Sequence, residues 1–248
     1  MIASMMMYER PQLADAHRRY WHLIRHKLSQ RGIESPQALS QQAEEFSVWT
    51  HPQLVLSQTC GMPYRTRLHG KVTLIGTADF ALPECPPGYY RSPLVVRADD
   101  NRQQLGDYRD GIFAYNQTYS QSGYAAAYWH LQTLGFWFDN TLHTEQHIES
   151  ARAVAEKRAD LASLDAVTWM MMQRYEPFTA GLRVLEWTEP TPGLPYISAI
   201  GADRELVFSA IEAAIEALTE DDRKLLGISG IVYIEPEAYL AIPNPPVE

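Results

Sequence analysis

Short apolar runs that suit buried strands alternate along this chain with longer stretches of helical periodicity. A run over residues 2–7 is followed by a helical pattern over residues 11–30. Between residues 112 and 175, three strand-like runs are each followed by a helix-like stretch. Because alternating strands and helices form a mainly parallel sheet with helices on both faces, the sequence predicts an α/β fold.

The same patterns predict the other elements. Ser35-Pro36 is a cap and first-turn pair, which predicts a helix to about Trp49. The strands are expected over residues 54–59, 71–76, 92–98, 112–115, 138–142, 161–164 and 182–187. The later helices are expected over residues 122–134, 146–159, 167–175 and 203–218. The end of the chain, after the helix at residues 203–218, is interpreted as a polar tail rich in proline.

Two segments rich in proline and glycine interrupt the alternation, one around residues 83–93 and one at residues 189–195. They divide the chain into two outer pieces and one inner piece. The predicted lobes are 1–90 with 192–248 for lobe I, and 91–191 for lobe II. Two lobes joined by two crossings make a hinged clamp, and ligands of such folds bind outside the carboxyl ends of the strands.

Size and charge narrow the classes of function. The 248 residues suffice for one large domain or two small ones. The net charge of −9 disfavours nucleic acid and anionic membranes as partners, because both need a broad basic face. No apolar run approaches the roughly 18 residues of a spanning helix, so we expect no membrane insertion.

The start of the chain lacks the features of an export signal, because no basic segment precedes its short apolar run. We expect a periplasmic protein if a native signal peptide was removed or lies upstream, and a cytoplasmic protein otherwise.

Signatures of enzymes and metal sites are absent from the sequence. It contains no G-x-x-x-x-G-K-[ST], no H-E-x-x-H and no G-x-G-x-x-G, and the serine segment at 120–123 lacks the first glycine of a nucleophile elbow. Cys60 and Cys85 are too few to bind a metal alone, and a disulfide and two thiols are equal alternatives for them. We expect no catalysis, no metal and no cofactor.

One long window of the chain carries no charge. From Gly111 to Phe138 there is no Asp, Glu, Lys or Arg, although the average acid content would place about three acids there. Inside it, Ser120 or Ser122 can cap a helix whose first amides then point at an anion, and Gly123 allows close approach of backbone to ligand. Plain helix capping is the structural alternative. The absence of carboxylates favours the anion site.

Four other residues are candidates by position. Asp165 follows a buried strand, where a carboxylate can accept a hydrogen bond from a ligand or cap the next helix. His147 lies at the start of a helix and can donate to an anion, or it is a solvated residue. Tyr8 and Thr59 follow strands of the outer lobe and can present hydroxyl groups, or they pack in the interior.

Several segments, taken in order, resemble the phosphate, phosphite and phosphonate-binding branch of the type 2 periplasmic solute-binding proteins. They are Met6-Met7-Tyr8, Gln58–Tyr64, Tyr89–Ser92, Ser120–Tyr124, His147–Ser150 with Arg152–Val154, Arg158–Ala162 with Asp165, and Thr188–Pro195. Together they span nearly the whole chain.

The resemblance implies a two-lobe type 2 fold with two crossover strands as its hinge. It implies that Ser120, Ser122 and the amides of Gly123 and Tyr124 hold the oxyanion, with His147 donating. Gln121 lies in the same loop, at a position where phosphonate-transport members of the family carry a hydroxyl residue. Ala166 follows Asp165, at a position where those members carry an aromatic residue. Tyr8 and Thr59 would bind from lobe I, and Asp165 would accept from a protonated ligand oxygen or an amine.

The resemblance implies that the protein captures a small phosphorus oxyanion for an ABC transporter. The permease is the candidate partner, and we expect the protein to be a monomer or weak dimer. The alternatives are a binder of a non-phosphorus ligand such as a pyrimidine precursor, and a cytoplasmic sensor or enzyme on the same scaffold.

Overall fold

The structure is a computed structural model that describes residues 1–246, which form two compact units. Unit 1 contains Met1–Tyr89 and Pro192–Ala241, and unit 2 contains Tyr90–Thr191 and the chain from Ile242 onward. The last segment belongs with unit 2, although it was predicted to belong to lobe I. Within unit 2, the indole nitrogen of Trp129 donates to the carbonyl oxygen of Pro243 at 3.0 Å. The chain therefore passes between the units three times.

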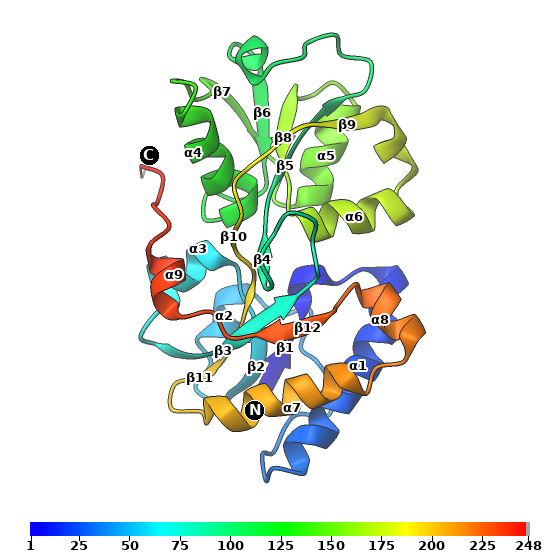
Figure 1. Ribbon diagram of the computed structural model, residues 1–248, viewed down its shortest axis with the longest axis vertical. Coiled ribbons are helices and arrows are strands. Elements are labelled where there is room, and N and C mark those ends of the chain that lie inside the picture. The colour runs from blue at the N-terminus through cyan, green and yellow to red at the C-terminus, as the bar shows by residue number, and fades with distance from the viewer. Residues whose placement is uncertain (247–248) are drawn as a thin grey trace. The chain divides into compact units, whose positions relative to one another are not determined.

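Unit 1 is built on a five-stranded sheet with the strand order β1-β2-β11-β3-β12 (Figure 1). The strands are β1 (Ile2–Ser4), β2 (Leu54–Gln58), β3 (Val72–Asp79), β11 (Pro195–Ala199) and β12 (Gly230–Val232). β1 and β2 are parallel, and β11 runs antiparallel to both β2 and β3. Strands β1, β2 and β3 consequently share one direction, and their carboxyl ends lie at the same edge of the sheet.

Helices cover both faces of this sheet. One face packs on α1 (Ala14–Ser29), α7 (Arg204–Glu216) and α8 (Glu220–Leu226). The other packs on α2 (Glu45–Trp49), on a π-helical turn that follows α3 (Gly61–Pro63), and on α9 (Pro236–Leu240). The buried face of α1 recurs at helical spacing through Tyr20, Ile24 and Leu28, so its packing follows from the periodicity of the sequence.

Unit 2 holds a second five-stranded sheet, with the order β7-β6-β8-β5-β9. The strands are β5 (Pro93–Arg97), β6 (Ile112–Tyr115), β7 (Asn140–His143), β8 (Leu161–Ser163) and β9 (Leu182–Trp187). β6 is parallel to both β7 and β8, whereas β5 is antiparallel to β8 and β9. Within residues 1–246, two of the four strand pairs in this sheet are antiparallel, as are three of the four pairs in the sheet of unit 1, so the sheets are mixed and the prediction that they are mainly parallel is corrected.

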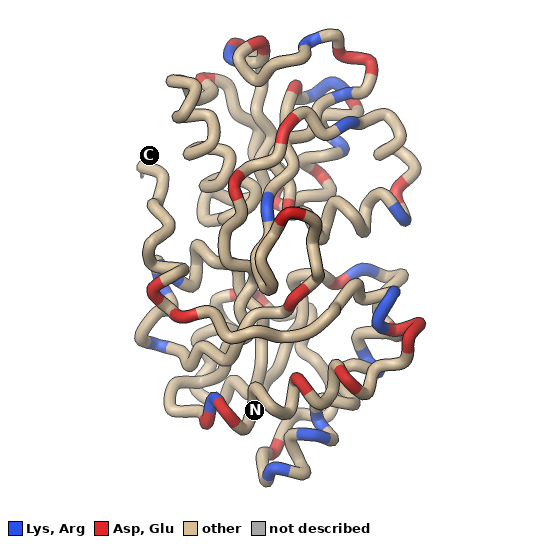
Figure 2. The backbone as a smooth tube through the Cα atoms, in the orientation of Figure 1, with Lys and Arg blue, Asp and Glu red and all other residues tan. Residues whose placement is uncertain are grey.

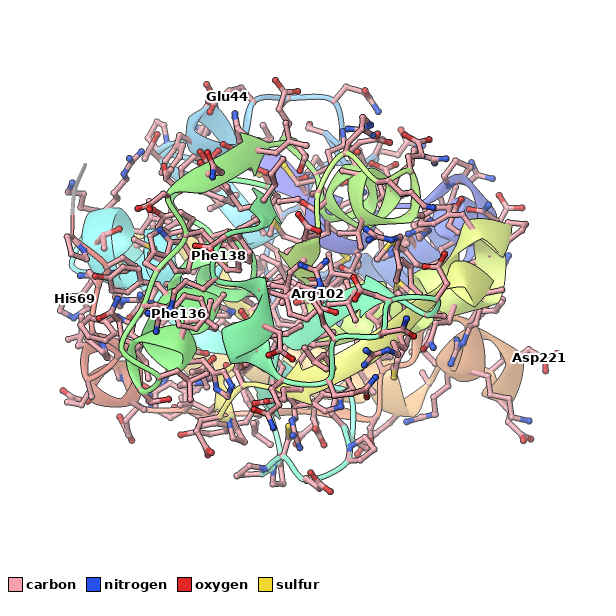
Figure 3. All side chains as sticks on the ribbon, turned by 90° about the horizontal axis from the view of Figure 1, so that it is seen from above. Glu44, His69, Arg102, Phe136, Phe138 and Asp221 are labelled. Atoms are coloured by element: carbon pink, nitrogen blue, oxygen red, sulfur yellow. The ribbon has the colours of Figure 1, made fainter. Side chains whose placement is uncertain are left out.

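This sheet also lies between two helical layers. One face packs on α4 (Ala126–Gln132) together with Phe136 and Phe138, whose ring centroids are 5.7 Å apart (Figure 3). The other face packs on α5 (His147–Ala155) and α6 (Ala166–Tyr175). The predicted α/β fold with helices flanking each sheet is confirmed.

Two short strands mark the first two crossings. β4 (Tyr89–Tyr90) pairs with β10 (Thr191–Pro192) in a sheet of their own. Close by, the amide of Gly193 donates to the carbonyl oxygen of Gly88 at 2.8 Å. A Cβ on Gly193 would lie 2.7 Å from that oxygen, so a side chain there would push the two segments apart.

The helix predicted from Ser35 to Trp49 is wrong except for its last turn. The segment before α2 instead follows the edge strand β1, where the amide of Ser40 donates to the carbonyl oxygen of Ala3 at 2.8 Å. The side-chain oxygen of Gln41 accepts from the amide of Met5 at 2.7 Å. The real cap is Glu44, which accepts from the first amides of α2.

The region after α7 is also not a simple polar tail. It contains α8, β12 and α9, and β12 completes the sheet of unit 1 by pairing with β3. Thr219 caps α8, and Gly227 ends it in the left-handed conformation with φ 68°.

Two further findings concern the cysteines and the possibility of a membrane-spanning helix. Cys60 and Cys85 are not joined in a disulfide. Within residues 1–246, no helix is both long and apolar enough to cross a membrane.

Candidate functional site

The predicted site residues of unit 2 follow three adjacent parallel strands. Asn116 and the serine loop (residues 120–124) come after β6, His147 comes shortly after β7, and Asp165 comes two residues after β8. Because parallel neighbours end at the same edge of a sheet, the topology gathers these segments at one edge.

The serine loop is a buried, tightly bonded turn. Ser120 caps it, with its Oγ accepting from the amide of Gly123 at 3.0 Å. Residues 121–125 form a π-helical turn that leads into α4. The carbonyl oxygen of Ser122 accepts a 2.5 Å hydrogen bond from Ser163 Oγ at the end of β8. The loop is therefore held both by its own cap and by the neighbouring strand.

Gly123 is needed because its surroundings leave no room for a side chain. A Cβ at this position would lie 1.9 Å from Oδ1 of Asn116 and 3.1 Å from the ring of His147. Oδ1 of Asn116 is buried and has no hydrogen-bond partner. Asn116 directly follows β6 and contacts the serine loop, and it is not among the ligand-binding residues predicted from the sequence.

His147 contacts the loop directly. Its Nε2 lies 3.1 Å from Oγ of Ser122. Burial lowers the pKa of His147 to about 4, and the backbone oxygen of Ser163, which favours the protonated ring, offsets only part of this effect. The imidazole is thus neutral at pH 7, and it meets Ser122 as a dipole and not as a cation.

The other loop residues have different roles. Gln121 is buried within the turn. The ring of Tyr124 packs edge-on against Tyr115 and Trp137, with centroids 5.1 and 5.3 Å away. The side chain of Tyr124 therefore lies in an aromatic cluster of unit 2 and contributes to its core.

Asp165 is the cap of α6. Its Oδ1 accepts from the amide of Thr168 at 2.8 Å, and the residue is buried. The capping role expected from its position is present. A carboxylate has capacity for further donors beyond one cap bond, so the cap leaves a ligand role open.

The candidates of unit 1 lie after two adjacent parallel strands. Tyr8 ends a short 3₁₀ turn after β1, and its ring packs edge-on against Phe80 at 5.3 Å. Thr59 directly follows β2 and is fully buried. Next to it, the side-chain nitrogen of Gln58 is buried without a hydrogen-bond partner. Gln58 is not among the ligand-binding residues predicted from the sequence.

Uncharged groups dominate the region of the serine loop. Helix α4, which the loop opens into, carries no Lys, Arg, Asp or Glu, and its trace is tan throughout in Figure 2. A helix start surrounded by hydroxyl and amide groups suits an anion without a basic side chain. Among residues 1–246, no group of three or more His, Cys, Asp or Glu side chains is placed to hold a metal ion.

Comparisons with known proteins agree with this architecture. The family model described as "ABC transporter, phosphonate, periplasmic substrate-binding protein" matches residues 76–239. No curated protein matches the sequence.

Solved structures share the fold at low sequence identity. A binding protein component of an ABC phosphonate transporter from Pseudomonas aeruginosa has a TM-score of 0.71 and 17% identity, over 98% of this chain and 83% of that one. PhnD1 from Prochlorococcus marinus, solved in complex with methylphosphonate, has a TM-score of 0.68 and 14% identity, over 96% and 93%. XAC2383 from Xanthomonas citri, solved with ATP, has a TM-score of 0.69 and 15% identity, over 96% and 91%.

Proposed function

The chain belongs to the family of periplasmic substrate-binding proteins of ABC phosphonate transporters, and from this premise we propose that it captures a small phosphorus oxyanion and delivers it to an ABC permease. Phosphate, phosphite and phosphonates are the candidate ligands. The protein binds without covalent chemistry, acts in the periplasm as a monomer or weak dimer, and is not an enzyme.

We propose that the two units act as the lobes of a hinged clamp, close to the predicted division into residues 1–90 with 192–248 and residues 91–191, except that the chain from Ile242 onward goes with lobe II. Family membership supports this, as do the two sheets built from separate parts of the chain. Closure of the lobes on the ligand would then be the event that the permease recognises.

The observation that carries the proposal is the serine loop. Oγ of Ser120 accepts from the amide of Gly123, and its own proton remains available to an anion. Oγ of Ser122 has the same capacity when the neutral His147 donates Nε2–H to it. These hydroxyl groups form a cradle of neutral donors at the positive end of a helix, and we propose that the amide of Tyr124 adds to it. The amide of Gly123, which was also expected to bind the oxyanion, donates to Ser120 instead.

The remaining candidates complete the site. Asp165 accepts from a protonated ligand oxygen or from the amine of an aminophosphonate. The hydroxyl groups of Tyr8 and Thr59 donate from lobe I. Gln121 occupies a loop position where other members carry a hydroxyl residue, so it influences which oxyanion binds with the highest affinity.

Calorimetric titrations with phosphate, phosphite, methylphosphonate and 2-aminoethylphosphonate test this function. We expect at least one of these ligands to give a saturable heat of binding that fits a single site. A protein that gives no heat or thermal shift with all four, but binds a pyrimidine precursor, would belong to the alternative class of organic-ligand binders.

A further inference from the structure

Ser163 ends strand β8 next to the start of the serine loop. β8 runs parallel to β6, and Ala162 of β8 pairs with Ala114 of β6. One residue further along both strands, Ser163 lies level with Tyr115, the last residue of β6. The chain continues from there into the serine loop, so the register of the two strands brings Ser163 beside it.

The side chain of Ser163 lies on the face of the sheet that packs on α4. Because side chains alternate along a strand, Ser163 shares a face with Leu161. Leu161 belongs to the same core cluster as Ala127 and Leu131 of α4. Ser163 is fully buried, and a buried hydroxyl group is costly unless it forms a hydrogen bond. Its hydrogen bond to the serine loop offsets that cost.

Two serine hydroxyl groups hold the peptide group between Ser122 and Gly123 from its two ends. The carbonyl oxygen of Ser122 accepts from Oγ of Ser163 at 2.5 Å. The amide nitrogen of Gly123, in the same peptide plane, donates to Oγ of Ser120 at 3.0 Å. All three serines are at most 5% exposed, so water competes little for these bonds.

The direction of these hydrogen bonds follows from the chemistry of the peptide group. A carbonyl oxygen only accepts and an amide N–H only donates, so Ser163 is the donor and Ser120 is the acceptor. The hydroxyl proton of Ser120 remains available to a further acceptor. Donation therefore runs one way, from Ser163 through the peptide group to Ser120 and on to the group that Ser120 binds.

We propose that Ser163 is a positioning residue that raises the affinity for the oxyanion without touching it, an inference that rests on the proposed function. Hydrogen bonds in a chain polarise one another and strengthen by about 10–30% per bond. The hydroxyl group of Ser163 polarises the peptide group, so the amide of Gly123 becomes a stronger donor to Ser120. Ser120 in turn becomes a stronger donor to the anion.

Calorimetric titration with methylphosphonate tests the effect on affinity. Ser163→Ala should weaken binding about threefold to tenfold, the range that one hydrogen bond contributes. Ser198→Ala is the matched control, because Ser198 is only 1% exposed and its Oγ donates to the carbonyl oxygen of Val55 in unit 1 at 2.6 Å. This variant loses the same kind of buried bond away from the serine loop, and its affinity should equal that of the parent.

NMR of the full protein separates polarisation from a loosened loop. Without ligand, the amide proton of Gly123 should resonate further upfield in Ser163→Ala than in the parent, because its hydrogen bond is weaker. Saturating methylphosphonate should move this resonance downfield, and the movement should be smaller in Ser163→Ala. A loop that is only loosened would bind more weakly but would show the full movement once saturated.

Three results would overturn the proposal. They are an unchanged Gly123 resonance in ligand-free Ser163→Ala, a full ligand-induced movement in that variant at saturation, and an equal loss of affinity in Ser163→Ala and Ser198→Ala. A parent protein that does not bind methylphosphonate would count against the proposed function instead. The ligand-free measurement would then still test whether Ser163 polarises the loop.

Discussion

The neutral imidazole of His147 determines how the candidate site attracts an anion. With its pKa lowered to about 4, it adds no positive charge at pH 7. Attraction must then come from hydroxyl groups, amides and the helix start, which bind an anion through directed dipoles. Such a site selects by geometry more than by net charge, and it does not conflict with the chain's overall charge of −9.

Stability should therefore depend on pH through His147. The unfolded ring titrates near 6.5 and the folded ring near 4, so between these values the folded state binds fewer protons. The free energy of unfolding should fall as pH is lowered from 6.5 to 4. Urea denaturation at pH 7 and pH 5 measures this. His147→Gln should show a smaller drop than the parent, and an identical drop would contradict the burial of the ring. Exposed His26→Gln is the matched control.

Substitution of Asp165 separates its two roles. Asn caps helices about as well as Asp, so Asp165→Asn should change the free energy of unfolding by no more than about 0.5 kcal/mol. Loss of the charge should weaken 2-aminoethylphosphonate about tenfold or more, because an ammonium group loses its carboxylate partner. Asp165→Ala should also cost about 1 kcal/mol of stability. Unchanged affinity in Asp165→Asn would restrict the residue to capping.

At the scale of elements, the serine loop is fixed by its neighbours as much as by its own cap. Ser163 bonds to it from β8, and His147 contacts it from the start of α5. The opposite edge of the sheet is also fixed, since Asp160 accepts from the amide of Ile112 at the start of β6 and from Arg102. The start of β6 and the loop that follows its end are thus each fixed by neighbouring segments.

Gly123→Ala should disrupt the loop. The new Cβ would overlap Asn116 and crowd His147, so one of them must move. We expect a loss of about 1–3 kcal/mol in the free energy of unfolding and loss of measurable oxyanion binding by calorimetry. Gly181→Ala in the same unit, where a Cβ meets nothing within 4 Å, should leave both unchanged. Wild-type binding in Gly123→Ala would remove this loop from the site.

The sequence predicted the elements whose pattern is local. Strands β6 and β9 begin and end where expected, because their apolar runs are bounded by turn residues. The helix predicted from Ser35 failed because its segment bonds to the distant strand β1, which no local pattern records. Strand β11 was missed because it follows a proline-rich crossing that was interpreted as loop.

In the candidate site too, features set by local sequence were predictable and contacts between distant segments were not. Ser120 and Asp165 were recognisable as caps from the residue types that start helices. The contacts of Asn116 and Ser163 with the loop could not be predicted, because they depend on which strands are neighbours in the sheet.

At the scale of the whole molecule, the chain connects its two units through three crossings, the third of them after Ala241. The first two are packed against each other where Gly193 approaches the carbonyl oxygen of Gly88. This contact fixes the backbone next to β4 and β10.

Gly193→Ala tests the importance of the packed crossings. Its Cβ would lie 2.7 Å from a backbone oxygen, which cannot move as a flexible side chain does. We expect a Tm several degrees lower, from about 1–3 kcal/mol of strain, and weaker oxyanion binding even though no proposed contact is altered. Gly106→Ala, at an open position, should match the parent. Unchanged affinity in Gly193→Ala would show that binding does not depend on the crossings.

We propose that the serine loop binds a phosphorus oxyanion through neutral donors. Calorimetric titration of Ser122→Glu with methylphosphonate tests it most directly, against Gln132→Glu, which adds the same charge at the exposed far end of α4. A carboxylate at the helix start repels the ligand, so we expect saturable binding in the parent and in Gln132→Glu and none in Ser122→Glu. Equal affinity in all three proteins would contradict the account.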